Sequence, residues 1–197
     1  ISEEWINLDN VWISPSPFVS ASADTGYFAG GRPSTNAVDK INFTSDTTAQ
    51  VPGASLTASK YYMGATSSST AGYFGGGVEV PGYAVVSSVD KLSYLSDTTA
   101  AVPGAKLTLS RWRLSATGTS THGYFGGGTI PGTSPFSTMD KVTYASDTTA
   151  AVPGAALSDG KYGSAATGNT THGYFAGGGP DSYTSVDKLT YSSDTTA

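Results

Sequence analysis

The stretch His122-Gly123-Tyr124-Phe125-Gly126-Gly127-Gly128 joins an aromatic pair to three glycines, and its recurrence decides how the chain is interpreted. The Gly-Tyr-Phe unit occurs four times, at spacings of 46, 51 and 50 residues, beginning at Gly26, Gly72, Gly123 and Gly173. Self-similarity at a nearly fixed period is typical of repeat architectures, in which each unit packs against its neighbours. The sequence therefore predicts an array of four related units.

Two further motifs follow each copy in the same order. The first is Val-Asp-Lys, or Met-Asp-Lys in the third copy, and its aspartates are Asp39, Asp90, Asp140 and Asp187. The second is Ser-Asp-Thr-Thr-Ala, which begins at Ser45, Ser96, Ser146 and Ser193. These motifs divide residues 19–197 into repeats of approximately 19–59, 60–109, 110–160 and 161–197. Residues 1–18 differ from the repeats and form a separate N-terminal segment.

Composition narrows the functional classes. The chain of 197 residues holds 25 glycines and 10 prolines, has 13% charged residues and carries a net charge of -5. This composition suits a turn-rich all-β protein, and the few scattered basic residues predict no surface for nucleic acid. The absence of cysteine excludes disulfides, thiolate catalysis and Cys-ligated metals. No run of 18 apolar residues is present, so we expect no membrane-spanning helix.

The third repeat shows the expected strand pattern. Aromatic and β-branched residues between frequent turn signals predict an all-β unit with strands at 111–117, 122–125, 139–144 and 149–152. Because side chains alternate along a strand, Asp140, Val142 and Tyr144 are expected to share one face.

Turn residues separate these strands. The glycines after Phe125 are expected where the backbone adopts positive φ or approaches another segment too closely for a side chain. Ser146 and Asp147 are expected to bond back to nearby amides in a tight turn. Pro153 and Gly154 are expected to end the fourth strand.

Four antiparallel strands in about 50 residues match the size of a propeller blade. Arg111, then Gly-Tyr-Phe-Gly-Gly, then Val-Asp-Lys-x-x-Tyr and a last short strand together resemble the kelch repeat. The resemblance implies an all-β, kelch-like β-propeller with about four four-stranded antiparallel blades, either complete or part of a larger array. The chain departs from the kelch pattern in the fourth strand, where Ala-Ala-Val or Ala-Gln-Val replaces the usual Trp.

A second resemblance concerns function. The run Thr-His-Gly-Tyr-Phe-Gly-Gly-Gly with Ser-Asp-Thr-Thr-Ala-Ala-Val-Pro-Gly-Ala is similar to repeat arrays in structural proteins of tailed phages of marine cyanobacteria. It covers the chain except for roughly the first 18 residues. It implies a non-enzymatic virion component, in a tail, fibre or other exposed appendage, that binds a host-surface glycan or protein or another virion protein through variable loops. The alternative is a secreted or cell-surface carbohydrate-binding propeller, lectin-like or associated with a hydrolase.

Closure of the array leaves three alternatives. In the first, residues 5–8 or 11–13 pair with the last repeat and cover its open edge. In the second, the array continues in a longer chain. In the third, a partner subunit covers the last repeat, and a homo-oligomer is one form of this arrangement. The chain begins at Ile1 and stops at Ala197 within a repeat motif, so we expect a trimmed chain or a piece of a longer one.

No catalytic, cofactor or metal site is predicted. The Asp-Lys aspartates recur in every repeat, which favours a strand-end hydrogen bond or ion pair over catalysis. The aspartates of the Ser-Asp-Thr-Thr turns supply too few oxygens for calcium. His122 and His172 lack an identifiable third metal ligand and are expected to cap strands. The copper chemistry of galactose oxidase-like kelch enzymes needs a cysteine, which the chain lacks.

Binding through loops is the remaining hypothesis. The linkers after the glycines vary from six to eleven residues, and aromatic residues beside cations precede the first strand of repeats two to four. An aromatic ring beside a cation can bind a sugar face or an acidic partner. The alternative is that the ring packs against the next blade and the cation bonds a carbonyl. The candidate binding residues are Tyr61, Trp112, Tyr162, Arg111, Tyr83, Phe136 and Tyr183.

Overall fold

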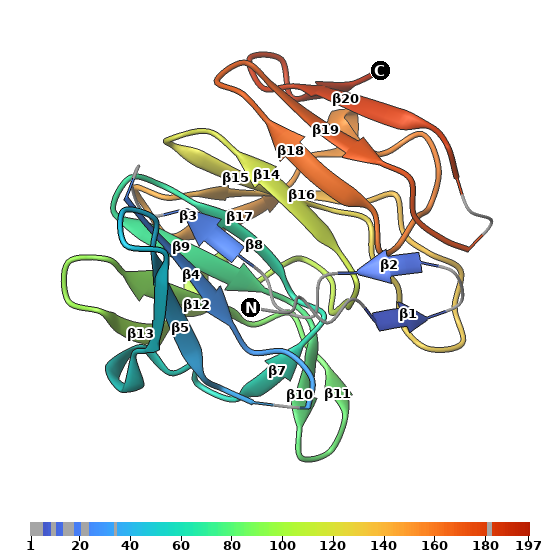
Figure 1. Ribbon diagram of the computed structural model, residues 1–197. Helices are drawn as coiled ribbons and strands as arrows, with labels where there is room; N and C mark the ends of the chain where they lie inside the picture. The colour runs from blue at the N-terminus through green and yellow to red at the C-terminus, as the bar shows by residue number, and fades with distance from the viewer. Residues whose placement is uncertain (1–5, 9–10, 14–17, 21–23, 34, 181–182) are drawn as a thin grey trace.

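The computed structural model describes residues 6–8, 11–13, 18–20, 24–33, 35–180 and 183–197 (Figure 1). Within these residues the fold is all-β, every strand pairing is antiparallel, and the helical elements are three short 3-10 turns. The 3-10 turns are η1 (Pro52–Ala54), η2 (Pro103–Ala105) and η3 (Pro153–Ala155). Each begins at a proline that ends the preceding strand, as expected for Pro153. No helix in the described part of the chain is long and apolar enough to cross a membrane.

Four of the sheets have four strands each, joined in simple succession, and are numbered here in chain order. Sheet 1 contains β3 (Phe18–Ser20), β4 (Thr25–Ala29), β5 (Val38–Asn42) and β6 (Thr47–Gln50). Sheet 2 contains β8 (Gly64–Ser67), β9 (Ala71–Gly75), β12 (Val89–Ser93) and β13 (Thr98–Ala101). Sheet 3 contains β14 (Ser115–Gly118), β15 (His122–Gly126), β16 (Met139–Thr143) and β17 (Thr148–Ala151). Sheet 4 contains β18 (Ala165–Gly168), β19 (His172–Ala176), β20 (Val186–Thr190) and β21 (Thr195–Thr196).

Neighbouring sheets pack against each other in chain order. The first strands form a continuous series of contacts from β3 to β8, from β8 to β14 and from β14 to β18. In Figure 1, sheet 4 lies at the top of the view, sheet 1 lies at the left, and sheets 2 and 3 come between them in the chain. A separate apolar cluster fills each of the three spaces between consecutive sheets. The core is therefore a series of layers between sheets.

The Gly-Tyr-Phe motif supplies two adjacent core layers. In sheet 3, Tyr124 packs with Phe175 toward sheet 4, whereas Phe125 packs with Tyr73 toward sheet 2. Consecutive residues on a strand point to opposite faces, so one dipeptide fills the space on both sides of its own sheet. Tyr124 and Phe125 are 1% and 0% exposed, which shows that sheet 3 is covered on both faces.

The glycines after the aromatic pair allow the close approach that was expected of them. Gly127 has φ +69°, and a Cβ atom there would lie 2.5 Å from the carbonyl oxygen of Lys161 in the next repeat. The amide of Gly128 donates a 2.8 Å hydrogen bond to that same oxygen. The glycine pair thus leaves room for the backbone of the following repeat to approach closely.

The first strand of repeat three begins later than the sequence predicts. It starts at Ser115 instead of residue 111, because Arg113 has φ +54°, far from the extended backbone of a regular strand. Trp112 forms only an isolated bridge with Thr129. The expected shared face of β16 is confirmed for Val142 and Tyr144, which lie in the cluster between sheets 2 and 3, whereas Met139 lies in the cluster between sheets 3 and 4.

The expected tight turn is confirmed, but the expected bonds from its side chains to nearby amides are wrong. Ser146 bonds the hydroxyl of Thr148, and the carboxylate of Asp147 accepts bonds from Tyr73 and Lys91 of sheet 2. A carboxylate within reach of a cation and a phenol gains more from these partners than from nearby amides.

Two smaller sheets lie outside the four. β7 (Ser59–Tyr61), β10 (Val78–Val80) and β11 (Ala84–Val85) form one, so part of the linker 78–88 is a hairpin. β1 (Ile6–Leu8) pairs with β2 (Val11–Ile13) in the other. These two strands pair with each other, and neither joins sheet 4, which takes all its strands from residues 165–196. Trp5 lies outside the described residues.

Candidate functional site

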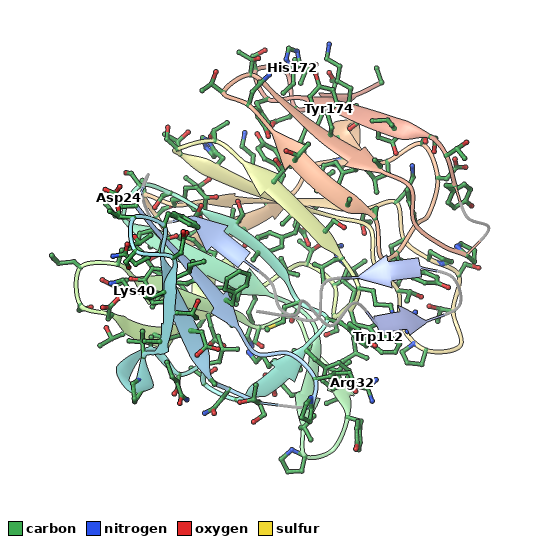
Figure 2. The ribbon with its side chains drawn as sticks, in the orientation of Figure 1. Asp24, Arg32, Lys40, Trp112, His172 and Tyr174 are labelled. Atoms are coloured by element: carbon green, nitrogen blue, oxygen red, sulfur yellow. The ribbon has the colours of Figure 1, made fainter. Side chains whose placement is uncertain are left out.

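The segments that precede the first strands of sheets 2, 3 and 4 bring aromatic and arginine side chains together with Arg32, which lies in the loop between β4 and β5. We name this group the aromatic–arginine cluster, and Figure 2 marks two of its members, Arg32 and Trp112. It consists of Arg32, Tyr61, Tyr62, Trp112, Arg113 and Tyr162. Three of the predicted binding residues, Tyr61, Trp112 and Tyr162, are therefore neighbours of one another through Tyr62 and Arg113.

Arg113 is the centre of the cluster. Its guanidinium lies 5.1 Å from the ring centroid of Tyr62, 4.8 Å from that of Trp112 and 5.3 Å from that of Tyr162. These distances are typical of cation–π contacts, which strengthen as the cation is withdrawn from water. The three rings come from three successive repeats, so Arg113 links the repeats as well as the rings.

A special backbone conformation places these side chains. Tyr62, Arg113 and Gly163 hold the same position in repeats two, three and four, and their φ angles are 60°, 54° and 64°. The amide of Arg113 donates to the carbonyl of Tyr62 at 2.9 Å, and the amide of Gly163 donates to that of Arg113 at 2.7 Å. Positive φ is costly for a side chain other than glycine, so Tyr62 and Arg113 are held there by the surrounding contacts.

The tyrosine side of the cluster is tightly packed. Tyr61 and Tyr62 meet edge to face at 4.9 Å, and Tyr62 meets Trp112 in the same way at 5.3 Å. The Arg32 guanidinium lies 5.1 Å from the Tyr61 ring and donates a 3.4 Å bond to the Tyr62 hydroxyl. This hydrogen bond raises the pKa of Arg32, so the cluster carries positive charge at its rim.

Two buried donors in the cluster have no hydrogen-bond partner among the described residues. They are the indole N–H of Trp112 and the Nε–H of Arg113. Buried donors are almost always satisfied in folded proteins, by protein, water or ligand. Both donors are enclosed by the protein, so the part of the cluster open to a ligand consists of the aromatic rings and the exposed Arg32 guanidinium.

Arg111 takes the alternative role, in which the cation bonds a carbonyl, instead of the binding role. It is fully buried, forms a 2.9 Å ion pair with Asp140, and donates to Thr138 and to the carbonyl of Phe125. Burial lowers the pKa of Arg111, and the Asp140 charge partly offsets this effect. The side chain lies in the interior of sheet 3 and takes no part in the binding surface.

The other repeats contain the same kind of buried ion pair. Lys60 and Asp90 are 3.0 Å apart in repeat two, and Lys161 and Asp187 are 2.6 Å apart in repeat four. The prediction that these aspartates form ion pairs is confirmed for Asp90, Asp140 and Asp187. Their partner is the cation before the first strand instead of the adjacent lysine.

The remaining predicted residues lie apart from the centre of the cluster. Tyr83 is 71% exposed at the tip of the β10–β11 hairpin. Phe136 is half-buried, and its carbonyl accepts a 3.2 Å bond from the amide of Lys161. Tyr183 is also half-buried, with its ring centroid 5.6 Å from the Lys161 ammonium. Phe136 and Tyr183 therefore accompany the buried cation of repeat four.

A second feature is an open groove of about 560 Å³ between sheets 3 and 4. Both histidines line it, and the Nδ1 atoms of His122 and His172 contact the hydroxyls of Thr121 and Thr171 at 2.9 and 2.8 Å. Burial and the nearby Lys141 charge lower the pKa of His122. No group of three or more metal-ligating side chains occurs in the described part of the chain.

The sequence prediction omitted Arg32, Tyr62 and Arg113 from the binding residues. A usable signal was present in repeat four, where Gly163 follows Lys161 and Tyr162. Glycine at that place indicates a positive φ. Because Tyr62 and Arg113 hold the equivalent positions in repeats two and three, the same positive φ is expected there. Comparison of the chain with protein-family models and with curated proteins finds no match in either.

Proposed function

We propose that this chain is a non-enzymatic structural and adhesive module of a phage particle, built from four kelch-like β-propeller blades. The observation that supports the proposal is that the recurring charged residues form buried ion pairs. In each of repeats two to four, the Asp-Lys aspartate pairs with a fully buried cation of its own repeat. Groups fixed in this way stabilise a frame, and a catalytic group would be open to substrate.

The blade interpretation is supported by the packing of the sheets. Consecutive four-stranded sheets place their first strands side by side, and the faces that meet are buried against each other. A frame of this kind holds loops at defined positions while their length and sequence vary. The exposed β10–β11 hairpin with Tyr83 and the ten-residue segment 129–138 are the loops that would contact a host surface or another virion protein.

Purified phage particles provide the test. An antibody raised against this domain is expected to label an exposed appendage of intact particles in immunogold electron microscopy, and peptides of the chain are expected in their proteome. Absence of the chain from purified particles would end the virion assignment. Hydrolysis of a polysaccharide by the purified chain would end the claim that it is not an enzyme.

The aromatic–arginine cluster favours a second candidate, a lectin-like module that binds carbohydrate. A sugar ring can lie against Trp112 while its hydroxyls accept from the exposed Arg32 guanidinium of the same cluster. A glycan array with the purified chain tests this, with Trp112→Ala as the site variant. Leu95→Ala is the matched control, because Leu95 is 98% exposed in the turn that ends sheet 2's third strand. Sugar binding that survives Trp112→Ala would exclude the cluster as the carbohydrate site.

A further inference from the structure

Consecutive sheets are joined by one recurring set of three side chains. Between sheets 2 and 3, the Tyr73 hydroxyl donates to Asp147 at 2.7 Å, and the Lys91 ammonium pairs with the same carboxylate at 2.7 Å. Tyr73 and Lys91 belong to sheet 2, and Asp147 is the last turn residue before β17 of sheet 3. We name this arrangement the Tyr–Lys–Asp clamp.

The clamp occurs at all three junctions inside the chain. Between sheets 3 and 4 the hydroxyl of Tyr124 lies 2.6 Å from Asp194, and Lys141 lies 2.8 Å from it. Between sheets 1 and 2, Tyr27 and Lys40 bind Asp97, with the ammonium at 3.0 Å. The clamp therefore always has the donors on the earlier sheet and the carboxylate on the later one.

The outer face of sheet 4 carries an unused donor half. Tyr174 and Lys188 correspond to Tyr124 and Lys141, and neither side chain forms a hydrogen bond or ion pair in the described part of the chain. Lys188 is exposed, and so is Thr167, which pairs with Tyr174, whereas its counterpart Thr117 is 7% exposed. Figure 2 shows Tyr174 at the top of the view, on sheet 4, far from Lys40 of sheet 1.

Sheet 1 carries the matching acceptor half. Asp46 corresponds to Asp97, Asp147 and Asp194, and its carboxylate is exposed and forms no ion pair with any described residue. Its φ of 52° agrees with the values of 50°, 51° and 52° at the three engaged aspartates. The acceptor at this end is therefore already in the conformation that the clamp requires.

We propose that a second copy of this chain binds here, so that sheet 1 of one copy covers sheet 4 of the other and Asp46 completes a clamp with Tyr174 and Lys188. Charge favours this occupant, since one end face offers a cation and a phenol donor and the other a carboxylate. The two faces are different, so the contact is head-to-tail and either closes into a ring or extends into a filament. This proposal does not depend on the function proposed above.

Other contacts of the internal junctions are present in part at the new one. Each internal clamp adds a stacked tyrosine pair, with ring centroids 5.3 Å apart for Tyr27 and Tyr94, 4.7 Å for Tyr73 and Tyr144, and 5.1 Å for Tyr124 and Tyr191. At the proposed junction Tyr174 would stack on Phe43, which stands at the place of Tyr94, Tyr144 and Tyr191 and is 39% exposed. The stacking contact would be retained. The hydrogen bond that corresponds to the one between the hydroxyls of Tyr144 and Thr66 would be lost, because phenylalanine has no hydroxyl.

Charge reversal tests the junction more sharply than neutralisation. Loss of one partly exposed ion pair changes affinity by only up to about fivefold. Lys188→Asp places a carboxylate against Asp46, and Asp46→Lys places an ammonium against Lys188, so each variant opposes like charges at its own junction. Lys106→Asp is the matched control, because Lys106 is exposed beside η2 and makes the same change of charge away from both end faces.

Sedimentation velocity over a range of concentrations, at low salt, gives the readout. Wild type and Lys106→Asp are expected to self-associate as concentration rises, and each end-face variant is expected to stay monomeric. In an equimolar mixture of the two end-face variants, every contact between unlike chains brings opposite charges together, either Lys188 against Asp46 or the two substituted side chains against each other. The mixture is therefore expected to recover the self-association that neither variant shows alone. A wild-type chain that stays monomeric, or a Lys188→Asp chain that associates like wild type, would overturn the proposal.

Discussion

The contribution of one clamp to stability can be isolated by a pair of matched substitutions. Tyr124→Phe removes the hydroxyl that donates to Asp194 at 2.6 Å and keeps the ring that stacks on Tyr191. A hydrogen bond to a charged group contributes about 1.5–3 kcal/mol. The Asp194 side chain is 32% exposed and keeps its ion pair with Lys141, so the lower end of that range applies, about 1.5 kcal/mol. For a chain of this length the loss lowers Tm by roughly 3–6 °C.

The control is the same substitution on sheet 4. Tyr174→Phe removes a hydroxyl that has no hydrogen-bond partner among the described residues, so its cost should stay within about 0.5 kcal/mol. Urea denaturation at a dilute protein concentration, with equal m-values for all three chains, measures both changes. Equal losses from the two substitutions, or a negligible loss from Tyr124→Phe, would refute the reasoning that the clamp holds consecutive sheets together.

Three further outcomes concern the Arg111–Asp140 ion pair, the close approach at Gly127 and the carboxylate of Asp194. Asp140→Ala leaves the Arg111 cation unpaired in the interior, so it is expected to lower the free energy of unfolding by about 3–5 kcal/mol in urea denaturation. Adding Arg111→Met should recover much of that loss. No recovery would mean that packing, and not charge, dominates there. Gly127→Ala should destabilise by about 1–3 kcal/mol more than Gly82→Ala, because both have positive φ but only Gly127 faces a carbonyl oxygen; equal losses would contradict the close approach. Burial of Asp194 acts to raise its pKa, but the bonds that it accepts outweigh burial and leave the pKa below its ordinary value. Its stabilising effect is therefore present above about pH 4 and is lost as pH falls further, so Asp194→Asn should flatten the acid limb of a stability–pH curve.

Much of the fold was predictable because the chain repeats. The period of the Gly-Tyr-Phe motif predicted four related β units, and the alternation of side chains predicted which residues of β16 share a face. The start of β14 was not predictable from the third repeat alone, because Arg and Trp are ordinary strand residues there. Only the backbone turn at Arg113, which Gly163 signals one repeat later, explains why the strand begins at Ser115.

The pairing of charges lay beyond local reasoning. Asp140 and Lys141 are adjacent in sequence, yet they point to opposite faces of β16 and bind different partners. Asp140 meets Arg111 of its own repeat, whereas Lys141 reaches Asp194 of the next. Local sequence patterns cannot identify an ion-pair partner that lies many residues away along the chain.

The sequence alone thus determined the number of units, their strands and the place of each motif, because periodicity and alternation are local properties of the chain. The tertiary structure decided which charges are buried, which rings surround Arg113 and which half of a clamp each end face carries. Those outcomes depend on the distance between consecutive sheets and on how one sheet is turned against the next. That distance is set by the close approach of the backbone at the glycine pairs and by core packing between repeats, so it is determined only when the sheets are assembled.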